Sequence, residues 1–83
     1  ISRFLGIVVA LFYNDRAPPH IHVSYGGHKA SVGIDPPTLL DGSLPPRALG
    51  LVVEWTSLHR TELLANWDRA RSQQVLFPVA PLE

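Results

Sequence analysis

Residues 13–22, with the sequence YNDRAPPHIH, hold most of the side chains in this chain that could do chemistry. His20 and His22 are separated by one residue, and side chains two apart on a strand project from the same face. Two neighbouring imidazoles could bind a phosphate or a metal ion, or act as the acid and the base of a reaction. Asp15 could orient one imidazole, and Tyr13 could donate its hydroxyl proton nearby. His20, His22, Tyr13 and Asp15 are therefore the candidate catalytic residues.

The reaction that best suits these residue types is metal-independent cleavage of RNA. Such an enzyme needs a base for the 2′-hydroxyl, an acid for the leaving oxygen and a cation for the phosphate. Arg16 and Lys29 are the candidate phosphate-binding residues. A purely structural interpretation also fits the sequence. In that interpretation His20 bonds the backbone of the Pro-Pro loop, and His22 is an ordinary surface residue of a strand.

The number of neighbouring ligands argues against a metal site. Zinc is normally held by three or four protein side chains, and the spacing guarantees only His20 and His22 as neighbours. His28 lies on the opposite face of the predicted hairpin, and His59 belongs to the predicted helix. The chain has no cysteine, which excludes thiolate ligands and disulfides. We expect no metal and no other cofactor.

A β-hairpin over residues 20–34 is expected to position the two histidines. Two alternating runs flank Gly26 and Gly27, and a Gly-Gly pair suits the positive φ angles of a two-residue hairpin turn. Counting outward from this turn puts His20 and His22 together on the polar face. The apolar face then receives the side chains of Ile21, Val23, Tyr25, Ala30, Val32 and Ile34.

The remaining elements complete a predicted α+β fold. Residues 4–13 are apolar on both faces, which is typical of a central strand, and residues 35–44 form a Pro- and Gly-rich loop. Residues 45–72 have helical spacing, either as one long helix or as two helices with a kink near His59. Residues 75–79 suit a short edge strand because they contain a proline. We therefore predict a three- to four-stranded antiparallel sheet packed on a long C-terminal helix that carries buried Trp55 and Trp67.

Composition limits the classes of protein to which the chain could belong. Its 83 residues suit a single domain over residues 1–83. Seven Lys and Arg balance seven Asp and Glu, so total charge does not indicate a basic nucleic-acid binder. No apolar run is long enough for a membrane span, and the opening residues lack a signal-peptide pattern, so we expect a cytoplasmic protein. The chain begins with Ile, and we expect residues to precede it in the natural protein.

Three segments carry a resemblance to a known family: FLGIVVALFYNDRAPPHIHVSYGG, LPPRALGLVVEW and ELLANWDRA. Together they resemble the bacterial domain-of-unknown-function family 4160 over nearly the whole chain. Genes of that family commonly lie beside those of a second small family, number 2442, in a layout similar to a toxin–antitoxin pair.

The resemblance implies a toxin that a cognate antitoxin neutralises by direct binding, with RNA or the ribosome as its target. The alternative is a non-enzymatic interaction module, or the antitoxin-like half of the pair, that extends a partner's sheet or forms an oligomer. A small metal- or nucleic-acid-binding regulator is a third hypothesis.

Overall fold

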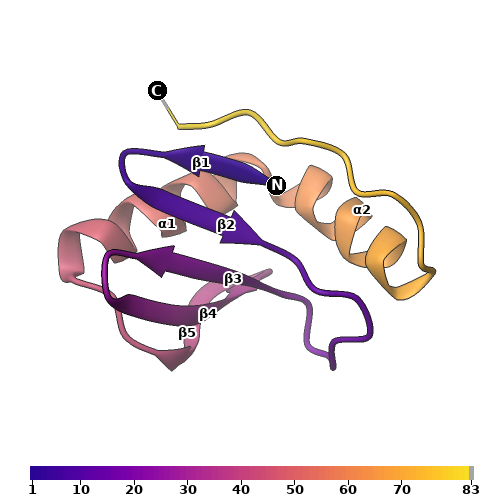
Figure 1. Cartoon of the computed structure of the whole chain (residues 1–83), viewed down its shortest axis with the longest axis horizontal. Helices are drawn as coiled ribbons and strands as arrows, with labels where there is room; N and C mark the ends of the chain where they lie inside the picture. Colours follow the sequence, from indigo (N-terminus) through magenta and orange to yellow (C-terminus); the bar gives the residue numbers. More distant parts are fainter. Residues whose placement is uncertain (83) are drawn as a thin grey trace.

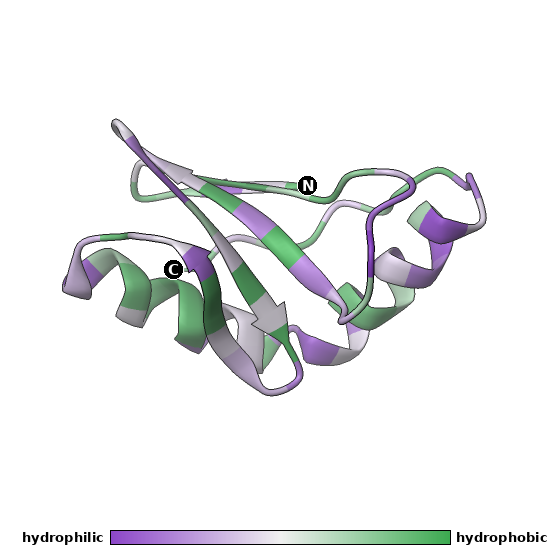
Figure 2. Ribbon diagram, turned by 90° about the horizontal axis from the view of Figure 1, so that it is seen from below, coloured by the Kyte–Doolittle hydropathy of each residue, from purple (hydrophilic) through white to green (hydrophobic). Residues whose placement is uncertain are grey.

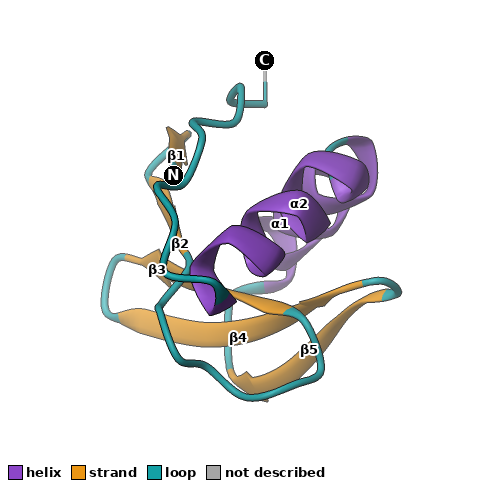
Figure 3. Ribbon diagram, turned by 90° about the vertical axis from the view of Figure 1, so that its right-hand side faces the viewer, coloured by secondary structure: helices purple, strands orange, loops and turns teal. Residues whose placement is uncertain are grey.

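The computed structural model describes residues 1–82 and has two layers, which confirms the predicted α+β class. A five-stranded antiparallel sheet follows chain order, and both helices lie against one of its faces (Figures 1 and 3). The sheet has five strands instead of the predicted three to four, and the helical region forms two helices, which was one of its two predicted alternatives, and not one long helix. The elements are β1 (Ser2–Phe4), β2 (Ile7–Ala10), β3 (His20–Tyr25), β4 (His28–Ile34), β5 (Pro37–Gly42), α1 (Pro46–Leu58) and α2 (Arg60–Arg71).

The hairpin of β3 and β4 has the predicted register. Ile21 pairs with Val32, and His22 pairs with Ser31 across the strands. Gly26 has a positive φ of 56°, as the tight turn requires. Ile21 and Val32 are fully buried, whereas His22 lies on the other face. Hydrophilic and hydrophobic bands accordingly alternate along the central strands in Figure 2.

The prediction of one strand over residues 4–13 was wrong. The chain turns at Leu5 and Gly6, whose φ angles are 51° and 80°, and β2 then pairs back onto β1. Leucine rarely adopts a positive φ, so the turn is poorly marked in the sequence. Ile7 in β2 is buried while Val8 is exposed, so β2 is covered mainly on one face rather than on both.

The segment predicted as a loop over residues 35–44 contains the edge strand β5. A proline at the first residue of an edge strand removes no ladder hydrogen bond that the sheet needs, so Pro37 is compatible with pairing. Gly42 ends β5 with a φ of 76°. A Cβ atom at this position would lie 2.2 Å from the carbonyl oxygen of Lys29, so only glycine fits there.

The predicted kink near His59 is confirmed, because α1 ends at Leu58 and α2 begins at Arg60. His59 has φ −112° and ψ 23°, which interrupts the helix. Both tryptophans are in the core as predicted, with Trp55 fully buried and Trp67 3% exposed. No helix within residues 1–82 is long and apolar enough to cross a membrane.

The predicted edge strand over residues 75–79 is absent, and the chain there is an extended segment beside β1 and α2 (Figure 1). Side chains from the helices hold this segment. Asn66 donates to the carbonyl oxygen of Phe77 at 2.8 Å and accepts from its N–H at 2.9 Å. The indole of Trp55 donates to the carbonyl oxygen of Ala80 at 2.8 Å. Helical side chains thus satisfy backbone groups that a neighbouring strand would otherwise pair, and Pro78 has no N–H to offer.

Candidate functional site

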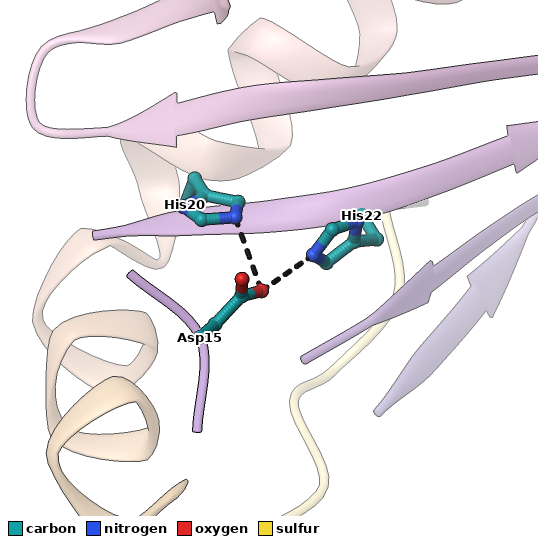
Figure 4. A group of neighbouring side chains, drawn as sticks. All are labelled: Asp15, His20 and His22. Atoms are coloured by element: carbon teal, nitrogen blue, oxygen red, sulfur yellow. Dashed lines mark hydrogen bonds and ion pairs between the residues drawn. The ribbon is translucent and has the colours of Figure 1, made fainter. Parts of the chain in front are cut away.

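Asp15, His20 and His22 form one cluster beside the start of β3 (Figure 4). Oδ2 of Asp15 lies 2.6 Å from Nε2 of His22 and 3.1 Å from Nε2 of His20. The side chains of His20, His22 and Asp15 are 12%, 28% and 25% exposed. The cluster is therefore shielded enough to hold a fixed geometry and open enough to meet a ligand.

The two histidines meet because they share one face of β3, but Asp15 reaches them only through the fold of the preceding loop. Asn14 turns the chain with a φ of 62°. Oδ1 of Asp15 accepts the backbone N–H of Arg16 at 3.2 Å, a local turn that leaves Oδ2 for the imidazoles. The prediction had Asp15 orient one imidazole, whereas in the structure its carboxylate contacts both.

Tyr13 lies outside the cluster and fastens the loop to the end of α2. Its hydroxyl donates to the carbonyl oxygen of Gln74 at 3.0 Å. Beside it, the side chain of Gln73 donates to Oδ1 of Asn14 at 2.8 Å. In this structure the Tyr13 hydroxyl therefore positions the loop that carries Asp15 and does not face the imidazoles.

The orientation of His20 is determined by a hydrogen bond and an aromatic contact. Its Nδ1 donates to the carbonyl oxygen of Pro18 at 2.8 Å, so the predicted bond to the Pro-Pro loop is present. The indole of Trp67 packs against the ring with centroids 5.1 Å apart. Trp67 was expected as a core residue, and its spacing along the helix carries no sign of this contact with His20.

His22 is held by a stacked aromatic ring. The ring of Phe12 lies over it with centroids 4.2 Å apart and an interplanar angle of 24°. Sequence reasoning missed Phe12 as a site residue, because it treated residues 4–13 as one strand. The available signal was that Phe12 lies near the end of the apolar run, just before the polar loop.

A hollow of about 250 Å³ lies next to the cluster on the polar face of the sheet. Its polar and aromatic lining consists of His22 and Phe12, Lys29, two serines of β3 and β4 (Ser24 and Ser31), and Asp41 of β5. Of the two predicted phosphate-binding residues, Lys29 therefore shares the hollow with His22. Arg16 is exposed on the loop and does not line it.

The Asp15 carboxyl titrates below its ordinary range. Partial burial by itself raises the pKa of Asp15, but the hydrogen bond from His22 and the nearby charge of His20 lower it, and the net shift is downward. Asp15 is therefore a carboxylate at neutral pH, and the Nε2–H of His22 donates to it. Nδ1 of His22 then has no hydrogen-bond partner among residues 1–82 and can accept a proton.

The other two histidines lie apart from the cluster, as expected. His28 is exposed at the start of β4, and His59 pairs with Glu62 at 2.7 Å. The expectation that only two metal ligands lie together was incomplete, because Asp15 adds a third. The three potential ligand atoms all lie within 4.8 Å of one another.

Comparison of the sequence with known protein families gives one match. The chain matches the family described as Domain of unknown function (DUF4160) over residues 6–68, which is more than half of its length. The chain belongs to that family, as the resemblance predicted, and the matched region includes the whole cluster. No curated protein and no solved structure gives a significant match to the chain.

Proposed function

We propose that the chain is the toxin of a bacterial, cytoplasmic toxin–antitoxin pair, and that it acts on RNA at the Asp15, His20 and His22 cluster. The observation that carries this proposal is the convergence of these three side chains beside a hollow that Lys29 also lines. A carboxylate–imidazole pair next to a lysine offers a proton acceptor and a phosphate-binding cation in one place.

The metal-free geometry favours unequal roles for the two imidazoles. Asp15 accepts the Nε2 proton of His22, as a carboxylate does when it holds an imidazole in the form of a base, and Nδ1 can then take the proton of an RNA 2′-hydroxyl. His20 donates its Nδ1 proton to the carbonyl oxygen of Pro18, and in its protonated form it also donates Nε2–H to Asp15 and so positions the carboxylate. Lys29 is suited to bind the phosphate, since its exposed side chain lines the hollow and ends in a cation on a flexible stem.

Growth on controlled expression tests the proposal. Expression of the chain alone should arrest growth, and co-expression of the small protein encoded beside it should restore growth through direct binding. His22→Ala and Asp15→Asn should abolish the arrest, whereas His28→Ala removes an exposed imidazole outside the cluster and should leave it intact. Normal growth with well-expressed wild type would contradict the toxin role. Arrest that persists in the His20→Ala, His22→Ala double variant would contradict the site.

The open edge of the sheet favours a second candidate function, a non-enzymatic interaction module. The strand β5 ends the sheet, and Leu39 and Leu40 on it are 39% and 45% exposed. Such an edge can accept a strand from a small partner protein. Residues 4–13 and 75–79 were the segments first considered for this role: β2 is paired on both sides, β1 forms the other edge of the sheet, and residues 75–79 are not a strand.

Partner binding without toxicity would favour the interaction module. A Leu40→Lys variant on the exposed edge should then weaken copurification with the neighbouring protein, while His22→Ala should leave copurification unchanged. The opposite pattern would favour the cluster as the functional surface.

A further inference from the structure

We infer that Asp15, His20 and His22 bind one divalent transition-metal ion, of which Zn²⁺ is the best representative. The inference rests on the geometry of the cluster. It deepens the proposed function by naming the cation at the reactive centre. Binding of the ion itself does not depend on that proposal, whereas contact of the bound ion with RNA rests on it. Two imidazoles and one carboxylate form a ligand set that suits zinc and similar ions, and it leaves coordination positions open.

The distances in the cluster fit a site that is ready for an ion. Ligand atoms about 2.1 Å from a tetrahedral ion lie roughly 3.4 Å apart. The carboxylate oxygen now lies 2.6 Å and 3.1 Å from the two Nε2 atoms. A movement of Asp15 of less than about 1 Å would therefore open both oxygen–nitrogen distances to this spacing. The ligand atoms of the two histidines already lie within 4.8 Å of each other. Asp15 belongs to a surface loop and is 25% exposed, so such a movement displaces no core residue.

The hydrogen bonds of His20 leave one of its ring nitrogens facing the Asp15 carboxylate. A carbonyl oxygen only accepts, so Nδ1 of His20 carries the proton of its bond to Pro18. Nε2 of His20 therefore faces the Asp15 carboxylate at 3.1 Å either as the second N–H of a protonated ring or as the lone pair of a neutral ring. In the neutral ring this lone pair and the carboxylate are two acceptors that need a cation between them. A metal ion bound by Nε2 of His20, Nε2 of His22 and Oδ2 of Asp15 would take the place of the proton and use all three atoms at once.

The surroundings have the features of a metal site beyond its direct ligands. A metal-binding histidine commonly donates its other ring N–H to a backbone carbonyl, which fixes the tautomer, and His20 does so to Pro18. Trp67 and Phe12 pack against the two rings and limit their rotation. Three protein ligands leave a position for water or a phosphate oxygen. When bound, the ion would supply Lewis-acid chemistry there in place of proton transfer by His22.

Zinc titration of the purified full chain tests the site. After treatment with EDTA and dialysis, calorimetry should show one Zn²⁺ per chain, and Co²⁺ should give visible absorption bands of nitrogen and oxygen coordination. Asp15→Asn, His20→Ala and His22→Ala should each weaken Zn²⁺ binding by at least about tenfold. His28→Ala is the matched control and should leave the affinity unchanged. Mg²⁺ should bind far more weakly, since it prefers oxygen ligands.

Two results would overturn the inference: wild type that binds Zn²⁺ no better than the His22→Ala variant, or a loss in His28→Ala as large as in the cluster variants. Asp15→Asn keeps the side-chain shape, so it remains informative if circular dichroism shows that His20→Ala does not fold. The growth experiment separates this inference from the toxin proposal. Zinc binding without growth arrest retains the metal site and rejects the toxin, and arrest by a chain that binds no zinc does the reverse.

Discussion

Asn66 should be a main determinant of how the C-terminal segment stays folded against the helices. Its side chain is fully buried, and its amide makes both a donated and an accepted hydrogen bond with the backbone of Phe77. Asn66→Ala removes both bonds and leaves an N–H and a carbonyl group of Phe77 without these partners. It also removes a bond that Oδ1 of Asn66 accepts from the Arg69 guanidinium at 3.0 Å, which water can replace more readily because Arg69 is only partly buried. Phe77 is 57% exposed, so water can solvate those groups in part and the cost stays near the ordinary value for a hydrogen bond.

The expected loss in the free energy of unfolding follows mainly from the two bonds to the Phe77 backbone. At about 1 to 1.5 kcal/mol each, the Asn66→Ala variant should be less stable by about 2–3 kcal/mol. For a domain of this size that corresponds to a fall in Tm of roughly 10–20 °C. Urea unfolding followed by tryptophan fluorescence measures the change, because the indole of Trp55 is bonded to the same segment at Ala80.

A matched control isolates the role of the buried amide. Gln74→Ala also deletes a side-chain amide, but Gln74 is exposed and contributes only its backbone carbonyl to the hydrogen bond with Tyr13. It should change stability by less than about 0.5 kcal/mol. An Asn66→Ala variant within about 0.5 kcal/mol of wild type would refute the reasoning, because it would show that water replaces both bonds at no cost.

Three further predictions concern the backbone at Gly42, the charge of Asp15 and the hydrogen bond of Tyr13. Gly42→Ala should lower the free energy of unfolding, measured in urea, by about 2–3 kcal/mol, because its Cβ would lie 2.2 Å from a carbonyl oxygen and its φ is positive. Gly50→Ala on the exposed face of α1 should raise the free energy of unfolding by about 0.5–1 kcal/mol, and equal effects of the two variants would contradict this reasoning. In metal-free protein the charged Asp15 should stabilise the fold at pH above 3.8, and this contribution should be lost as the pH falls through the lowered pKa of Asp15. Wild type should therefore be more stable than Asp15→Asn at neutral pH, and a difference in the free energy of unfolding that grows in acid would contradict the prediction. Tyr13→Phe should cost less than about 1 kcal/mol but raise the rate of proteolysis in residues 13–19, and an unchanged cleavage rate would show that the bond to Gln74 does not restrain the loop.

Local rules explain what could be predicted about the sheet. The register of β3 and β4 followed from Gly26 and Gly27, because a two-residue turn and a side-chain period of two leave no other alignment of the apolar face. Leu5 and Pro37 show the limit of the same rules. Leu5 occupies a positive φ that its residue type disfavours, and β5 pairs despite its proline because it lies at the edge. In both places tertiary pairing outweighed local preference.

The candidate site also combines features that the local sequence determines with features that depend on the tertiary fold. The sequence by itself determined that His20 and His22 share the polar face of one strand, since that depends only on the backbone period. Only the tertiary structure decided that Asp15 bridges both imidazoles and that Tyr13 turns away to Gln74. The position of a loop residue depends on contacts with segments far along the chain, here the end of α2, and no local pattern encodes such contacts.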